Sequence, residues 1–178
     1  GIGLLEDTQR YLVQRMGISL ADVAVPTRVV RYLHRDGSAV HETDRTYHFS
    51  SWTTVYRLLL RHWGRDRYRL GHEMTGFATD PDGVTVTFAG GAAERADLLV
   101  CADGAGSVAR EVLQPGAVPT YAGYVAWRAV VPENDVSAPV RARLTEALTY
   151  FVLPDSHILI YPIPGRDGSV RPGERLIN

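Results

Sequence analysis

The chain has 178 residues, of which 45% are hydrophobic and 22% charged, so it can build a core and does not belong to the disordered class. Its net charge of −1 gives no overall field that would attract nucleic acid or an acidic membrane. All 19 basic residues are arginines, which excludes lysine Schiff-base chemistry. The single cysteine, Cys101, excludes an internal disulfide, and its apolar neighbours predict a small core residue. No apolar run reaches membrane-spanning length and no leader opens the chain, so we expect a soluble, cytoplasmic protein.

The first half of the chain alternates predicted helices and hairpins. In two segments, apolar residues recur at helical spacing and the pattern ends at a glycine. In two others, apolar and polar residues alternate on both sides of a turn sequence. The expected elements are a helix over 6–16, a hairpin over 28–43 around Asp36-Gly37, a helix over 53–63 capped by Thr53 or Thr54, and a hairpin over 71–91 around Pro81-Asp82-Gly83.

A buried strand is predicted over 98–102, because the run is continuously apolar and leads directly into a short helix over 107–113. Beyond it the chain becomes aromatic and β-rich. The expected elements there are a strand over 121–131, a helix over 138–147, and strands over 148–154 and 157–165. The pattern predicts a sheet-and-helix region to residue 117 and the start of a β-rich region from residue 118.

Asp103, Gly104 and Gly106 stand where the apolar run ends and the short helix begins. With Ala109 the glycines fit the G-x-G-x-x-A dinucleotide pattern, but no second strand with a terminal acid follows at the required spacing. A carboxylate at the end of a buried parallel strand can instead accept hydrogen bonds from sugar hydroxyls. Asp103 could equally cap the helix together with Ser107. Ligand and cap roles are compatible, and both stay open.

The segment ADLLVCADGAGSVAREVL, residues 96–113, resembles the Asp-Gly segment of the FAD-dependent aromatic monooxygenases, the p-hydroxybenzoate hydroxylase-like flavoproteins. Three further stretches agree in order. They are GIGLLEDTQRYL at 1–12, SSWTTVYRLLL at 50–60, and YAGYVAWRAVV at 121–131 taken with HILIYPIPGRDGS at 157–169. The last pair resembles the substrate domain of the 2,6-dihydroxypyridine 3-monooxygenase branch. The family's opening G-x-G-x-x-G and its late Gly-Asp segment are absent, so we expect an internal fragment.

The resemblance implies an α/β (mixed α+β) fold, truncated at both ends: the middle of a Rossmann-like FAD-binding domain over 1–117 and the start of an inserted β-rich substrate domain over 118–178. It implies FAD as cofactor, NAD(P)H as co-substrate, and hydroxylation of an electron-rich aromatic or hydroxypyridine ring through a flavin C4a-hydroperoxide. Such a fragment is expected to be inactive alone. The FAD-binding residues that it implies are Gly3, Leu4, Leu5, Trp52, Arg57, Asp103 and Gly104. Trp52 stands where many members carry arginine or glutamine, so Arg57 is the alternative contact.

Substrate residues are expected in the β-rich region. His157 is the candidate base that helps to deprotonate a phenolic substrate, although a strand-edge histidine bonded to backbone is an alternative. Trp127 and Arg128 would lie on opposite faces of a strand, so only one can line a pocket. Tyr161 could bond a substrate hydroxyl or simply pack.

Other partners and activities are less favoured by the residues. His34, His41 and His48 recur every seven residues, which on a hairpin alternates faces, so no metal site is expected. The basic stretch from Arg57 to Arg69 reads as a solvated surface, so no nucleic-acid partner is expected and no membrane partner either. A small aromatic substrate is the expected ligand, and a homodimer stays open. The alternatives are a non-catalytic ligand-binding or interaction module, or a flavin-dependent reductase or halogenase relative; absence of lysine argues against the halogenase.

Overall fold

The structure is a computed structural model that describes residues 1–178, and it divides into two compact units. The first unit contains residues 1–65 and 127–178, and the second contains residues 66–126. The expected boundary between residues 117 and 118 refers to the domains of a flavoprotein, and it stays a prediction. None of the helices has the length and apolar character that crossing a bilayer requires.

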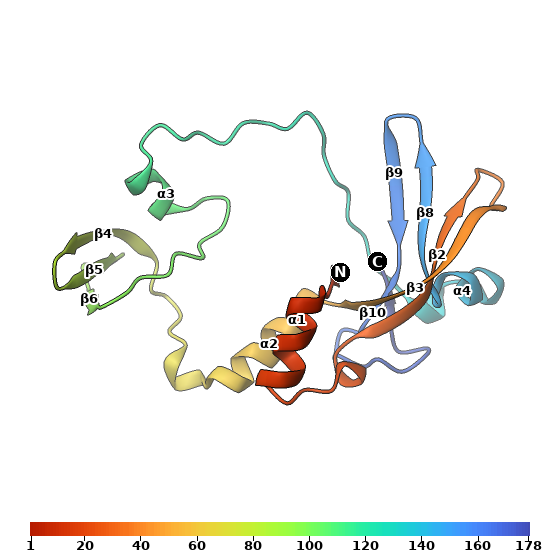
Figure 1. The fold of residues 1–178 in the computed structure, drawn as a ribbon, viewed down its shortest axis with the longest axis horizontal. Helices are drawn as coiled ribbons and strands as arrows, with labels where there is room; N and C mark the ends of the chain where they lie inside the picture. The colour runs from red at the N-terminus through yellow and green to blue at the C-terminus, as the bar shows by residue number, and fades with distance from the viewer. The chain divides into compact units, whose positions relative to one another are not determined.

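The centre of the first unit is a five-stranded sheet in which the strand order is β1-β3-β2-β8-β9 (Figure 1). Its members are β1 (Ile2–Gly3), β2 (Val25–Leu33), β3 (Ala39–Ser50), β8 (Ala147–Leu153) and β9 (Ser156–Ile160). The pairs β2–β3 and β8–β9 are antiparallel hairpins, while β2 and β8 run parallel in the middle. The predicted hairpin over 28–43 and the predicted strand over 148–154 are therefore confirmed.

Two helices pack together beside β1. The helix α1 (Glu6–Arg10) continues as a wider turn over Tyr11–Arg15 and ends at Gly17, whose φ of +65° suits glycine. The second helix is α2 (Trp52–Trp63). Both predicted helices are confirmed. The apolar side chains that join them and the short 3-10 turn Leu20–Asp22 are Leu4, Leu12, Met16, Val23, Ala24 and Leu58.

The predicted cap of α2 was wrong. Ser51, not Thr53 or Thr54, precedes the helix with an extended backbone, and its Oγ accepts a hydrogen bond of 3.0 Å from the Thr54 amide. Thr53 and Thr54 already have helical backbone, so neither can hold the cap position.

The rest of the first unit is a small sheet and one further helix. Strands β7 (Val131–Pro132), β10 (Pro162–Ile163) and β11 (Leu176–Ile177) pair in the order β10-β11-β7. The helix α4 (Ala138–Leu144) confirms the predicted 138–147 helix in a shorter form, and it follows the 3-10 turn Glu133–Asp135. The predicted strand over 157–165 is divided at Tyr161 into β9 and β10.

The second unit holds a three-stranded antiparallel sheet of β4 (Met74–Asp80), β5 (Gly83–Phe88) and β6 (Ala93–Ala96), which follows the 3-10 turn Arg65–Arg67. The predicted hairpin over 71–91 is confirmed. Strand β6 was missed because its sequence, AERA, has no apolar alternation. The helix α3 (Val108–Leu113) confirms the predicted 107–113 helix and lies against β4.

Two predicted strands are wrong. Residues 98–102 are not in a strand, and the side chains of Leu98 and Val100 are each 76% exposed. Cys101 is exposed as well, so the expected core position is wrong too. Of residues 121–131, only Val131 is in a strand. Residues 98–102 and 121–130 have strand-like composition, but no strand of this chain pairs with them, and a strand needs such a partner for its backbone groups.

Candidate functional site

The Asp103-Gly104 turn of the second unit has a backbone that only glycine adopts without strain. Gly104 has φ of +74°, and a Cβ added at Gly104 or at Gly106 would meet no other atom within 4 Å. The turn is therefore open on its outer side. A backbone of this kind lets a ligand approach the main chain closely.

The Asp103 carboxylate is both a helix cap and a free acceptor. Its Oδ2 accepts a hydrogen bond of 3.3 Å from the Ala109 amide, and the Ser107 hydroxyl accepts one of 3.0 Å from the Arg110 amide. The hydrogen bond from the Ser107 side chain, with smaller help from backbone amides of α3, lowers the pKa of the Asp103 carboxyl below its ordinary value. The cap role is confirmed. The carboxylate is also exposed and ionised, so it can still accept bonds from a sugar diol.

Gly3, Leu4 and Leu5 of the first unit offer a ligand their backbone and one exposed side chain. The Leu4 side chain is only 4% exposed and packs in the helix core, while its amide donates a 2.8 Å bond to the His48 carbonyl. Leu5 points to solvent. Gly3 pairs with Phe49, and a Cβ at Gly3 would lie 3.5 Å from the Phe49 ring. The main chain here runs along the edge of the sheet, next to an aromatic side chain.

The first two turns of α2 carry the other expected cofactor residues. Trp52 is mostly exposed at the start of the helix. Arg57 lies about one turn further along and donates a 3.2 Å hydrogen bond to the carbonyl of Arg166. The loop around Gly168 is also close to Thr54, since a Cβ at Gly168 would lie 4.0 Å from the Thr54 Oγ1. The α2 helix and the loop that follows β10 therefore form one surface. Leu4 packs in the same apolar cluster as Leu58 of α2, so the neighbouring Leu5 also lies close to the helices α1 and α2.

Aromatic side chains gather on one part of the five-stranded sheet, and sequence reasoning identified only one of them. Tyr161 stacks on Phe49, with ring centroids 4.1 Å apart and planes at 23°. Tyr32 stacks on Tyr150 at 5.0 Å and 12°, and Tyr47 tilts against Phe49 at 6.0 Å. We call the five residues Tyr32, Tyr47, Phe49, Tyr150 and Tyr161 the aromatic face; all five belong to one apolar cluster. The signal that could have found the others is the alternation Tyr47–His48–Phe49 and the cross-strand pair Tyr32–Tyr150.

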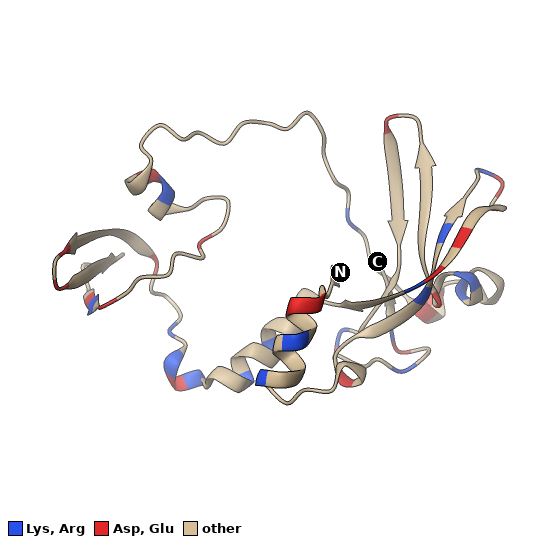
Figure 2. Cartoon of the chain, viewed as in Figure 1, with Lys and Arg blue, Asp and Glu red and all other residues tan.

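The aromatic face has little formal charge. The only acidic or basic residue of the β8–β9 hairpin, apart from a histidine, is Asp155 at its turn (Figure 2). At the other side of the face Arg45 lies 5.1 Å above the Tyr47 ring. Burial, followed by the neighbouring phenols of Tyr32, Tyr47 and Tyr161, raises the pKa of the Tyr150 hydroxyl. The phenol of Tyr150 is therefore a neutral donor throughout the physiological pH range.

His157 belongs to the same side of the sheet. In the β8–β9 ladder, His157 pairs with Val152 and Leu159 pairs with Tyr150. Paired residues point to the same face of the sheet, and so do residues two apart on one strand, so His157 and Tyr150 share a face. His157 is exposed and lies one diagonal step from Tyr150. Tyr161 comes directly after the last residue of β9, and its side chain is buried. The structure thus brings His157 and Tyr161 to one face with Tyr150.

Trp127 does not join this arrangement. Its side chain is 94% exposed, and residues 121–130 are not in a strand, so the expected opposition of Trp127 and Arg128 across a strand is wrong. Asp103 and Gly104 belong to the second unit. The FAD and substrate roles of all the expected site residues stay predictions.

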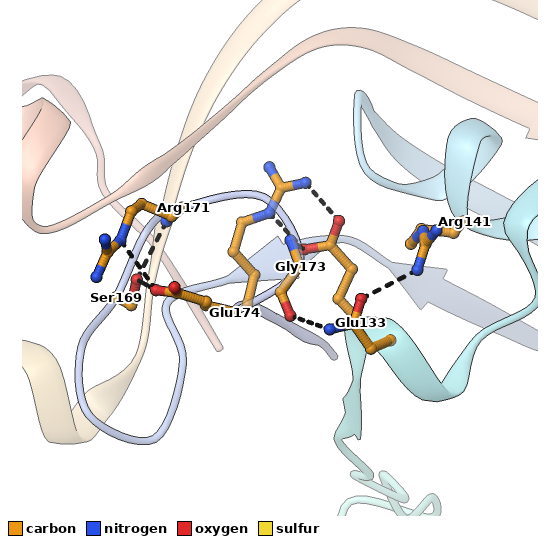
Figure 3. A network of polar contacts seen from close by, with 8 residues as sticks. Glu133, Arg141, Ser169, Arg171, Gly173 and Glu174 are labelled. Carbon is orange, nitrogen blue, oxygen red and sulfur yellow. Dashed lines mark hydrogen bonds and ion pairs between the residues drawn. The ribbon is translucent and has the colours of Figure 1, made fainter.

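A network of polar contacts fixes the loop that leads to β11 (Figure 3). Arg175 forms two hydrogen bonds, of 2.7 and 2.8 Å, with the nearly buried Glu133 carboxylate, which also accepts one of 3.0 Å from the Gly173 amide. These contacts lower the pKa of Glu133, the bond from Arg175 being the main cause. Asn134 connects Gly173 to Arg141 on α4. Because β11 pairs with β10, this network holds the strand that follows Tyr161.

Comparison with known proteins gives one consistent result. The FAD binding domain-like family matches residues 121–178. The 2,6-dihydroxypyridine 3-monooxygenase of Paenarthrobacter nicotinovorans is 32% identical over 97% of this chain, and the match covers 43% of that enzyme. The FAD-dependent urate hydroxylase of Klebsiella pneumoniae is 42% identical over 48% of this chain and 22% of its own length.

Solved structures agree. The 2,6-dihydroxypyridine-3-hydroxylase from Arthrobacter nicotinovorans superposes with a TM-score of 0.88 at 31% identity, over 99% of this chain and 45% of that one. A Klebsiella pneumoniae protein solved with FAD and uric acid superposes with a TM-score of 0.73 at 26% identity, over 93% of this chain and 42% of that one. The chain spans less than half the length of each of these relatives.

Proposed function

We propose that this chain, which is related in sequence and in fold to FAD-dependent aromatic monooxygenases, serves FAD- and NAD(P)H-dependent hydroxylation of a small, electron-rich aromatic ring such as a hydroxypyridine. The observation that carries the proposal is the match to a 2,6-dihydroxypyridine 3-monooxygenase over 97% of the chain, at 32% identity. The fold supports it as well, with a TM-score of 0.88 to a 2,6-dihydroxypyridine-3-hydroxylase.

The residues of the structure fit FAD at two places. In the second unit, the open turn at Gly104 and the ionised Asp103 carboxylate suit a ribose, whose hydroxyls donate hydrogen bonds. In the first unit, the chain at Gly3–Leu5 runs beside the first half of α2, where the start of the helix, the Trp52 side chain and the Arg57 guanidinium could contact the cofactor. When bound, FAD would supply the redox chemistry with NAD(P)H and O₂, and the protein would bind and orient it.

The aromatic face is the proposed substrate site. A flat ring would pack on side chains that are themselves flat and uncharged, and Tyr161 would bond a ring substituent. His157, exposed on the same face as Tyr150, is the proposed base for a phenolic proton, because an imidazole nitrogen is the side-chain group that most often takes this role. Trp127, an exposed residue of the first unit, is proposed as a further substrate contact.

The test is a titration of the purified chain with FAD, followed by flavin fluorescence and absorption. We expect saturable binding that Asp103→Ala weakens about tenfold to a hundredfold, the range for a lost hydrogen bond to a charged group. Ser107→Ala is the matched control, because it removes a cap of the same helix and leaves the carboxylate in place.

The outcomes separate the alternatives. Equal loss in Asp103→Ala and Ser107→Ala would assign the effect to the folding of α3 and not to a flavin contact. A wild-type chain that binds no FAD at all would contradict the proposal and favour a ligand-binding or interaction module.

A further inference from the structure

Tyr150 occupies the middle of the aromatic face. Tyr32 stacks flat against it from β2, at 5.0 Å, and Leu159 stands directly opposite on β9. His157 is a diagonal neighbour of Tyr150 across this ladder, and Tyr161, which directly follows β9, belongs to the same apolar cluster as Tyr150. The candidate substrate residues His157 and Tyr161 are therefore both neighbours of Tyr150.

The polar atoms around Tyr150 are mostly phenols. Those of Tyr32, Tyr47 and Tyr161 are close enough to affect its ionisation, and Tyr32, Tyr47 and Tyr150 are each half-buried, so part of each ring is open to a ligand. The other titratable and charged groups on this side are His41, whose ring is 6.1 Å from that of Tyr32, Arg45 and His157. No carboxylate of the β8–β9 strands competes for these donors.

We propose that Tyr150 is the residue that selects hydroxylated rings: its phenol donates a hydrogen bond to a ring oxygen of the substrate, while the Tyr32–Tyr150 stack holds the ring flat. This inference rests on the proposed function, since it assigns a role within the same substrate site. Its chemistry follows from the cluster. A neutral phenol is a good donor to an oxygen that is itself acidic or ionised, as in a hydroxypyridine, and gives nothing to an unsubstituted ring.

The test compares two ligands of the same ring size, 2,6-dihydroxypyridine and pyridine, by calorimetric titration of the flavin-free chain. Tyr150→Phe keeps the ring and its stacking and removes only the hydroxyl. We expect it to weaken 2,6-dihydroxypyridine binding about tenfold and to leave pyridine binding unchanged, because one hydrogen bond is lost. Tyr11→Phe is the control, since Tyr11 is an exposed tyrosine of the same unit and lies on the turn that extends α1.

Three results would overturn the inference. Tyr150→Phe could bind 2,6-dihydroxypyridine as tightly as the wild type, or lose both ligands equally, or the wild type could fail to prefer the hydroxylated ring. Tyr32→Phe is a second variant that keeps the stack, and it should retain the preference; if it abolishes the preference while Tyr150→Phe does not, Tyr32 and not Tyr150 is the selecting residue.

The FAD titration separates this inference from the proposed function. A wild-type chain that binds FAD but shows no preference among the rings contradicts only the role of Tyr150. A chain that binds neither FAD nor 2,6-dihydroxypyridine contradicts both.

Discussion

Two tyrosine-rich regions of the chain lie in opposite environments. In the sheet of the first unit, Tyr32, Tyr150 and Tyr161 pack against other rings and are half-buried or buried. In the segment 117–130, Tyr121 and Tyr124 are each 75% exposed and no residue belongs to a strand. The two regions have similar composition, so composition does not explain the difference.

Strand pairing explains why the tyrosines are buried in one region and exposed in the other. Tyr32 is hydrogen-bonded into a strand with a neighbour on each side, β3 and β8, which order its backbone before its side chain packs. Residues 117–130 have no neighbouring strand in this chain. Aromatic and β-branched residues fit a pleated surface when one is present, and they do not create it.

Limited chymotrypsin digestion tests this comparison with the largest expected effect. The same residue types are present in both regions, so the sites differ only in structure. We expect cleavage after Tyr121, Tyr124 and Trp127 to be at least about a thousandfold faster than after Tyr32 or Tyr150, because cleavage within a sheet requires local unfolding. Mass spectrometry of the early fragments measures it. Comparable rates in the two regions would show that the sheet is not stably formed.

The two bidentate arginine–carboxylate pairs extend the comparison to charged groups. Arg175–Glu133 in the first unit is nearly buried, whereas Arg95–Asp80 in the second unit is half-exposed. Glu133→Gln leaves a buried guanidinium without its partner, so we expect a loss of about 3 kcal/mol in the free energy of unfolding. Asp80→Asn removes an exposed ion pair, so it should leave the free energy of unfolding of the second unit unchanged within error. Urea denaturation followed by tryptophan fluorescence measures Glu133→Gln, since Trp52, Trp63 and Trp127 all belong to the first unit, and far-ultraviolet circular dichroism, which also follows the second unit, measures Asp80→Asn.

The effect of Glu133→Gln on the free energy of unfolding should depend on pH in a definite direction. The folded-state pKa of Glu133 lies below its unfolded value, so the stability it contributes is complete above the unfolded pKa, roughly 4.3, and is lost as the pH falls through the folded pKa. The gap in unfolding free energy between the wild type and Glu133→Gln should be constant from pH 7 to about pH 5 and shrink below about pH 4. A gap that persists unchanged at pH 3 would assign the effect to packing.

The sequence predicted the elements whose signals are local. The helices over 6–16 and 53–63 have apolar spacing and a terminal glycine, and both hairpins have turn residues between alternating runs. Asp103 and Gly104 were identified for the same reason, because a turn and a cap depend on adjacent residues. The predictions that were wrong or missing concern features that depend on residues far apart in the sequence. The strand predicted over 98–102 has no neighbouring strand. The aromatic face was missed because it joins residues of β2, β3 and β8 that no spacing rule connects.

The smallest expected effect separates two caps of the same chemistry. Ser51 is the cap of α2 and Ser107 the cap of α3, each accepting a 3.0 Å bond from the amide three residues later. Ser51→Ala should destabilise the first unit by about 1 kcal/mol and speed hydrogen exchange at the Thr54 amide about fivefold. Ser107→Ala should have a smaller effect on α3, because Asp103 still accepts a bond from the Ala109 amide.

Amide exchange in the two variants, read at Thr54 and Arg110, measures both effects in one type of experiment. Adding Asp103→Ala to Ser107→Ala should then produce the full loss that Ser51→Ala shows alone, since no side-chain acceptor would remain at the start of α3. If the double variant exchanges no faster than Ser107→Ala, the Asp103 carboxylate is not needed to cap α3, and its position at the Gly104 turn would have to be explained by ligand binding alone.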